Sequence, residues 1–175
     1  MSDHIKSIIQ RIGETDQLYL QGNLPELALE RADLRLQLVM QSQLRQEQIY
    51  FLQEAVVLLE QGRIEFEEMP LRLYADLSLH LAKAYMIYFE ITREARFATI
   101  TQQILKPITH HDFGDIYFFL AYASAVKNEP SLTRHWLKKY SATQAFDLGL
   151  LREHSAFKEF HTAPWFSQML QSKLH

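Results

Sequence analysis

Few glycine and proline residues occur in this chain, and most of them fall where the helical spacing of apolar residues breaks. There are 5 Gly and 5 Pro in 175 residues. No segment shows the sustained alternation of apolar and polar residues, bounded by turn residues, that β-strands give. The sequence therefore predicts an all-α fold.

The prolines mark where helices begin. Proline is tolerated in the first turn of a helix, because the N–H that it lacks has no intrahelical partner there. Pro25, Pro70, Pro130 and Pro164 each stand at the start of a helical apolar pattern. The pattern predicts about eight helices, at residues 3–21, 25–40, 44–61, 71–90, 93–105, 114–127, 130–142 and 164–173, with a short turn or two of helix between 147 and 161.

One long stretch has no such marker. Between Glu26 and Gln61 neither Gly nor Pro occurs, so the stretch fits either one bent helix or two helices. The polar group from Gln41 to Gln43 is the expected break, and Gly62 is the expected end of the second helix.

Composition limits the function. The formal net charge is -3, which gives no general attraction to nucleic acid or to anionic lipid. No cysteine occurs, so disulfides and thiol chemistry are excluded. The start of the chain lacks the pattern of a secretory signal, and the longest uncharged apolar run is well short of the roughly 20 residues that span a membrane. We therefore expect a cytoplasmic protein without a membrane partner.

Two helices indicate how the core is built. In helix 71–90, two apolar rows at spacings of three and four predict burial on two sides. Helix 114–127 has no charge from Ile116 to Ala123, so we expect it at the centre of the fold. The remaining side of helix 71–90 is a narrow polar stripe. Its residues follow one another about one turn apart on the same face, and they are Arg72, Asp76, His80 and Lys83.

The hairpin from Tyr117 to Tyr140 has a large residue, a leucine three positions on, a small residue next, a turn, and a second helix. The first three of these are Tyr117, Leu120 and Ala121. In this pattern the hairpin resembles a divergent tetratricopeptide-repeat-like (TPR-like) unit. Three positions depart from the family pattern, namely Ser124, Asn128 and Thr133.

A second resemblance lies near the end of the chain, where a segment is similar to the one that often closes arrays of these repeats. Together the two imply stacked antiparallel helical hairpins in a short right-handed solenoid. We expect a single all-helical domain over 1–175, with N-terminal helices at 1–65, TPR-like hairpins at 70–143 and a capping segment at 144–175. The capping residues are Phe157, Phe160, Pro164, Phe166 and Leu170.

In such a solenoid the first helix of each hairpin lines the concave face, which commonly binds peptides. The polar stripe of helix 71–90 would lie on that face, and the less apolar side of helix 114–127 would continue it. The predicted partner-binding residues are Arg72, Asp76, His80, Lys83, Tyr117 and Ser124. The leading hypothesis is therefore a non-enzymatic protein–protein interaction module that binds a protein segment.

The sequence contains little that indicates catalysis or metal binding. His110, His111 and Asp112 are adjacent, and three neighbours rarely converge on one ion. There is no H-E-x-x-H motif, Gly-x-Ser-x-Gly elbow or glycine-rich phosphate loop. We expect no enzyme activity, no metal and no cofactor.

Two other functions stay open. A helical-bundle regulator would bind a small apolar ligand between helices 71–90 and 114–127, in a pocket lined by Tyr85, Tyr88, Phe119 and Tyr122. A self-assembling subunit, such as a homodimer, would pack an apolar tail on a second copy through Trp165, Phe166, Met169 and Leu170. An acidic segment around Gly62 could also attract a basic partner through Glu60, Glu65, Glu67 and Glu68.

Overall fold

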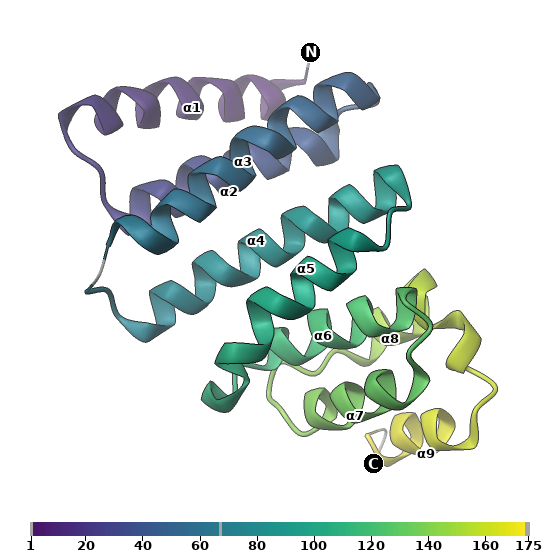
Figure 1. Cartoon of the computed structure of the whole chain (residues 1–175). Coiled ribbons are helices and arrows are strands. Elements are labelled where there is room, and N and C mark those ends of the chain that lie inside the picture. Colours follow the sequence, from purple (N-terminus) through teal and green to yellow (C-terminus); the bar gives the residue numbers. More distant parts are fainter. Residues whose placement is uncertain (1, 67, 174–175) are drawn as a thin grey trace. The chain divides into compact units, whose positions relative to one another are not determined.

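The chain is all-helical in a computed structural model that describes residues 2–66 and 68–173 (Figure 1). Eight of the helices in these residues are seven or more residues long, as predicted. The helices are α1 (Asp3–Gln21), α2 (Pro25–Gln41), α3 (Arg45–Glu65), α4 (Leu71–Thr92), α5 (Arg96–Leu105), α6 (Gly114–Val126), α7 (Pro130–Ser141), α8 (Leu148–Glu153) and α9 (Pro164–Ser172), with two 3-10 helices, η1 (Lys106–His111) and η2 (Ser155–Phe160).

The prolines begin helices as the sequence predicted. Pro25, Pro130 and Pro164 are the first residues of their helices, and Pro70 is the N-cap of α4. The expected break between α2 and α3 is also confirmed, because α2 ends at Gln41 and α3 begins three residues after Ser42.

Gly62 does not end a helix, and that prediction was wrong. It lies inside α3 and is buried. A β-carbon at this position would lie 3.2 Å from the β-carbon of Ala28 and 3.4 Å from a methyl group of Leu77. Glycine is present here because α2 and α4 pack closely on α3, and not because the chain turns. Of the predicted acidic segment, Glu67 lies outside the described residues.

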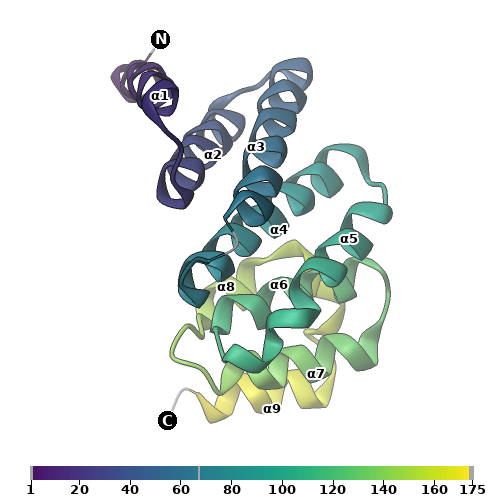
Figure 2. The same cartoon turned by 60° about the vertical axis from the view of Figure 1, so that its left-hand side comes forward.

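The chain forms two compact units, which divide between Glu94 and Ala95. This division falls within the segment predicted as hairpins, 70–143, and a single domain over the whole chain stays a prediction. In the first unit, α2 packs on α1, α3 and α4, and α3 packs on α4 (Figure 2). Its core is aliphatic and includes Leu36, Leu52, Leu59, Leu77, Leu81 and Met86.

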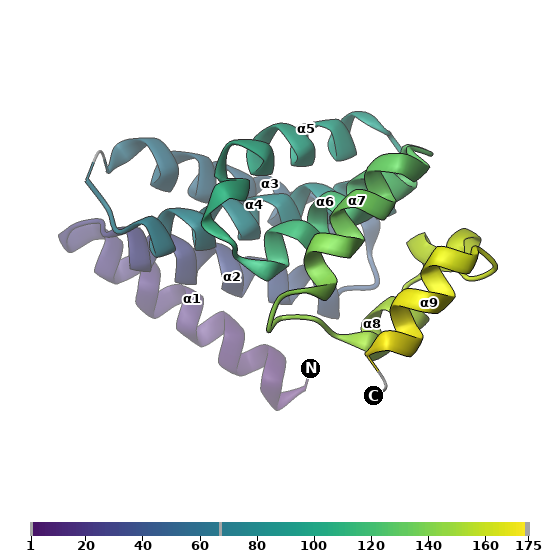
Figure 3. The ribbon, with the colours of Figure 1, turned by 90° about the horizontal axis from the view of Figure 1, so that it is seen from below.

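The second unit is built around α6, as its charge-free sequence predicted. Helix α6 packs on α5 and α7, which are its neighbours in the chain (Figure 3), and on η2. Its core is more aromatic and includes Ile116, Leu120, Tyr140, Phe157 and Phe166. None of the helices in the described residues is both long and apolar enough to cross a lipid bilayer.

Candidate partner-binding face and a buried arginine pair

The predicted polar stripe lies along α4 of the first unit and is partly accessible. Arg72 and Lys83 are exposed, while Asp76 and His80 are half-buried. The Nε atom of Arg72 lies 3.4 Å from Oδ1 of Asp76, and 64% of the Arg72 side chain remains exposed. The stripe therefore presents one accessible cation near each end.

Helix α2 adds two polar side chains to the same face, which the sequence analysis missed. The Nε2 atom of His80 lies 3.3 Å from Oδ1 of Asp33. The side-chain amide of Gln37 donates a hydrogen bond of 2.8 Å to the other oxygen of Asp33. The two helices pack against each other, so these groups form one surface. We call it the polar face, and it consists of Asp33, Gln37, Arg72, Asp76, His80 and Lys83.

The surroundings of His80 favour its charged form. Burial is the largest single influence on the pKa of His80 and lowers it, but the hydrogen bonds to Asp33 and to the Asp76 carbonyl outweigh burial, so the pKa is raised above its ordinary value. The Nδ1 atom lies 2.9 Å from that carbonyl oxygen, which can only accept a hydrogen bond. The bond from His80 in turn holds the pKa of Asp33 below its ordinary value. When His80 is protonated, the centre of the polar face is therefore an ion pair.

Tyr117 and Ser124 do not extend this face, and their placement on a partner-binding surface was wrong. In the second unit Tyr117 is 3% exposed and Ser124 is fully buried. The Tyr117 hydroxyl donates to the Thr109 carbonyl at 2.9 Å and lies 2.8 Å from Asp112, and burial raises its pKa to about 12. The Ser124 hydroxyl donates to the Leu120 carbonyl at 2.8 Å. Both side chains therefore form hydrogen bonds inside the second unit and present no surface to a partner.

A pair of buried arginines lies on the other side of α2, and the sequence analysis missed it as well. Arg31 is 9% exposed and Arg35 is 6% exposed. Each bonds to Asp16 of α1, from Arg31 Nε at 2.9 Å and from Arg35 Nη2 at 3.3 Å. Arg35 Nε also donates to Glu54 of α3 at 2.7 Å. Two cations and two carboxylates thus link the three helices.

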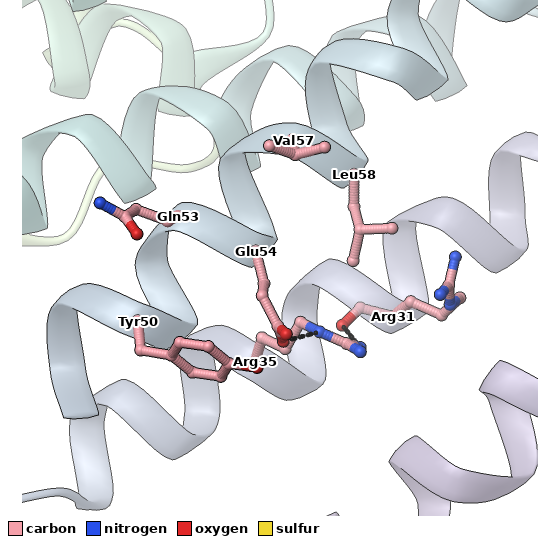
Figure 4. Close-up of a pocket in the computed structure, with 7 residues that line it drawn as sticks. All are labelled: Arg31, Arg35, Tyr50, Gln53, Glu54, Val57 and Leu58. Atoms are coloured by element: carbon pink, nitrogen blue, oxygen red, sulfur yellow. Dashed lines mark hydrogen bonds and ion pairs between the residues drawn. The ribbon is translucent and has the colours of Figure 1, made fainter.

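A cavity of about 330 Å³ opens over this network (Figure 4). In the figure, Arg35 lies under Glu54 in the centre, and Tyr50 and Val57 stand beside them on α3. Leu58 and Gln53 also line the cavity. The carboxylates that accept hydrogen bonds from these arginines lie 15 to 19 residues away in the sequence. In the sequence, the only sign of the network is that two Arg residues lie on the apolar side of an expected helix.

The residues of the other two hypotheses lie as follows. Phe166 is fully buried in the second unit and Met169 is 9% exposed, so two of the four residues of the predicted self-assembly tail pack within their own unit.

The ligand pocket predicted between helices 71–90 and 114–127 stays a prediction. Tyr85 and Tyr88 belong to the first unit, and Phe119 and Tyr122 belong to the second.

The described residues contain no group of three or more His, Asp or Glu placed to hold a metal ion. Comparisons of the chain with protein-family models, with curated proteins and with solved structures found no match.

Proposed function

We propose that this chain is a non-enzymatic, cytoplasmic interaction module, and that it binds a segment of a partner protein on the polar face of its first unit. The observation that carries the proposal is the pairing of Asp33 with His80, because it joins α2 and α4, which pack directly on each other, into one polar surface. Arg72 and Lys83 flank this pair at exposed positions.

The packing order supports a TPR-like arrangement for the first unit. Helix α3 packs on both α2 and α4, and α2 packs directly on α4. This is the order expected where the first helices of successive hairpins lie side by side and line a common face. On this reading α2 and α4 supply the binding surface, and α3 lies behind them.

Recognition would depend on charge and register. Arg72 and Lys83 would bind carboxylates of the partner or its chain terminus, because both cations are exposed. The ion pair of His80 and Asp33 would offer a fixed donor and acceptor between them. Such charged groups select a partner and set its orientation more than they add affinity.

The test is capture of partners from the source cell by the full chain and by the variant Arg72→Glu with Lys83→Glu. The matched control is Lys6→Glu with Arg45→Glu, which makes the same charge change at two exposed positions away from the face. Equal helicity of all three proteins is checked by circular dichroism.

A partner retained by the wild type and by the control, but lost by the Arg72/Lys83 variant, supports the proposal. If the two variants capture the same proteins as the wild type, the polar face is not the binding surface and the proposal is wrong. Capture of no protein by the wild type would also count against an interaction module.

A further inference from the structure

The outer side of α3 carries three exposed apolar side chains at intervals of seven residues. Tyr50 is 57% exposed, Val57 is 54% exposed and Ile64 is 79% exposed. Seven residues are close to two turns, so all three project from one side of the helix over a length of roughly 21 Å. We call these three residues the α3 ridge.

The seven-residue interval keeps these side chains on one side of α3, at one of the two apolar positions per heptad along which helices pack. An exposed apolar row becomes a surface suited to a partner helix where hollows beside it can take up apolar side chains. Hollows lie beside the ridge at both ends. The cavity of about 330 Å³ adjoins Tyr50 and Val57, and a second, of about 390 Å³, adjoins Ile64 and Leu71. Each can receive an apolar side chain from a helix laid along α3.

The charges that α3 itself places nearest the α3 ridge are acidic. Arg31 and Arg35 of α2 also line the first cavity, but they are paired with Asp16 and Glu54. At 100° per residue, Glu47, Glu54, Glu60 and Glu65 all lie within roughly 80° of the ridge direction, whereas Arg45 and Arg63 lie about 120° away. Arg63 is turned toward α4, where it donates to the Tyr74 hydroxyl at 3.0 Å.

Arg35 neutralises only one of these carboxylates, that of Glu54. Glu60 accepts from the Tyr85 hydroxyl at 2.8 Å, and Glu65 accepts from the Asn23 amide at 3.0 Å. Both partners are neutral. Among the described residues no Lys or Arg pairs with Glu47, Glu60 or Glu65, so these three negative charges stay uncompensated.

We propose that the α3 ridge docks a basic amphipathic helix of a partner protein. The apolar stripe of that helix covers Tyr50, Val57 and Ile64, and its Lys and Arg residues meet Glu47, Glu60 and Glu65. A second copy of α3 is a poor occupant, because it would bring the same carboxylates against each other. This site is separate from the polar face, so the module joins two partners.

The probe is a synthetic helix of about four turns, with leucine at the heptad a and d positions and lysine and alanine elsewhere. A matched peptide has glutamate in place of every lysine. Binding of each labelled peptide to the full chain is measured by fluorescence anisotropy at low and high salt. The lysine peptide should bind at least about tenfold tighter than the glutamate peptide and should weaken as salt is raised.

The site is located with variants at exposed positions. The variant Val57→Asn with Ile64→Asn removes the apolar contact and should weaken the lysine peptide by about tenfold or more. The control is Leu20→Asn with Met40→Asn, since these apolar residues are equally open, at 75% and 64% exposed, but lie on other helices. The control should leave binding within about twofold of the wild type.

Three results would overturn the proposal. The two peptides could bind equally, the ridge variant could bind as the wild type does, or light scattering could show a dimer that becomes monomeric only in the ridge variant. The last result would mean that a second copy, and not a basic helix, covers the ridge.

Discussion

Replacement of Asp16 by alanine should destabilise the first unit by about 2 kcal/mol. Among the described residues of α1, Asp16 alone forms ion pairs with the buried Arg31 and Arg35. The ring of Tyr19, also on α1, lies 4.3 Å from the Arg31 guanidinium and keeps that contact in the variant. A hydrogen bond to a charged group contributes about 1.5–3 kcal/mol, and breaking a fully buried ion pair costs about 3–5 kcal/mol.

The expected loss of stability lies in the lower of these two ranges for two reasons. The Asp16 side chain is 39% exposed, so water partly screens its charge. Arg35 also retains its bond of 2.7 Å to Glu54. Arg31, in contrast, loses its carboxylate while its own side chain is only 11% exposed. A loss of about 2 kcal/mol corresponds to a change of about thirtyfold in the folding equilibrium.

The assay is urea unfolding followed by circular dichroism, together with hydrogen exchange of the α1 amides. Asp16→Ala should lower the free energy of unfolding and speed exchange in α1 more than in α3, because α1 packs mainly on α2. Glu47→Ala is the control, since Glu47 is exposed on α3, and it should change stability by less than about 0.5 kcal/mol. If Asp16→Ala matches this control in both measurements, the network does not hold α1 in place.

Three further predictions concern His80, two glycines and Phe166. Because the pKa of His80 is raised above 6.5 and that of Asp33 is lowered below 3.8, their pair stabilises most between these two ordinary pKa values. The stability lost in His80→Gln, measured by urea unfolding, should therefore shrink as the pH rises through the folded pKa of His80, and a constant loss would contradict the ion pair. A β-carbon at Gly13 meets nothing within 4 Å, so Gly13→Ala should stabilise by about 0.5–1 kcal/mol. At Gly114 it would lie 2.6 Å from a side-chain carbon, so Gly114→Ala should destabilise by about 1–3 kcal/mol, and equal effects in the two thermal melts would refute the packing. Phe166 is fully buried, so Phe166→Ala should cost about 3–5 kcal/mol in the unfolding of the second unit, whereas a change in oligomeric state alone would restore the self-assembly hypothesis.

Helix positions could be predicted well from the sequence because the signals are local. Proline fixes a helix start through its own ring, so α2, α7 and α9 begin where expected. The prediction for Gly62 failed because the same residue type serves a different purpose there. Gly62 lies inside α3 and allows α2 to pack closely, since a β-carbon at this position would come 3.2 Å from that of Ala28. A glycine that breaks a helix and one that allows close packing look alike in a single sequence.

The site was harder to predict because its contacts are distant in sequence. The stripe on α4 was visible as a polar row, but its partner Asp33 lies on α2, 47 positions before His80, and no local pattern connects the two. Tyr117 and Ser124 were misplaced because α6 is covered on nearly every side. In a helix buried all round, the less apolar side need not be a surface.

The most direct test of the central claim is photo-crosslinking from the polar face in the source cell. Lys83, which is exposed, is replaced by a photoreactive phenylalanine derivative, and Lys106, exposed on the second unit, is replaced in the control. The account predicts that position 83 crosslinks to one defined protein segment, identified by mass spectrometry, and that Arg72→Glu in the same chain abolishes this product. If position 83 gives no more crosslinked product than position 106, the polar face does not bind a protein partner.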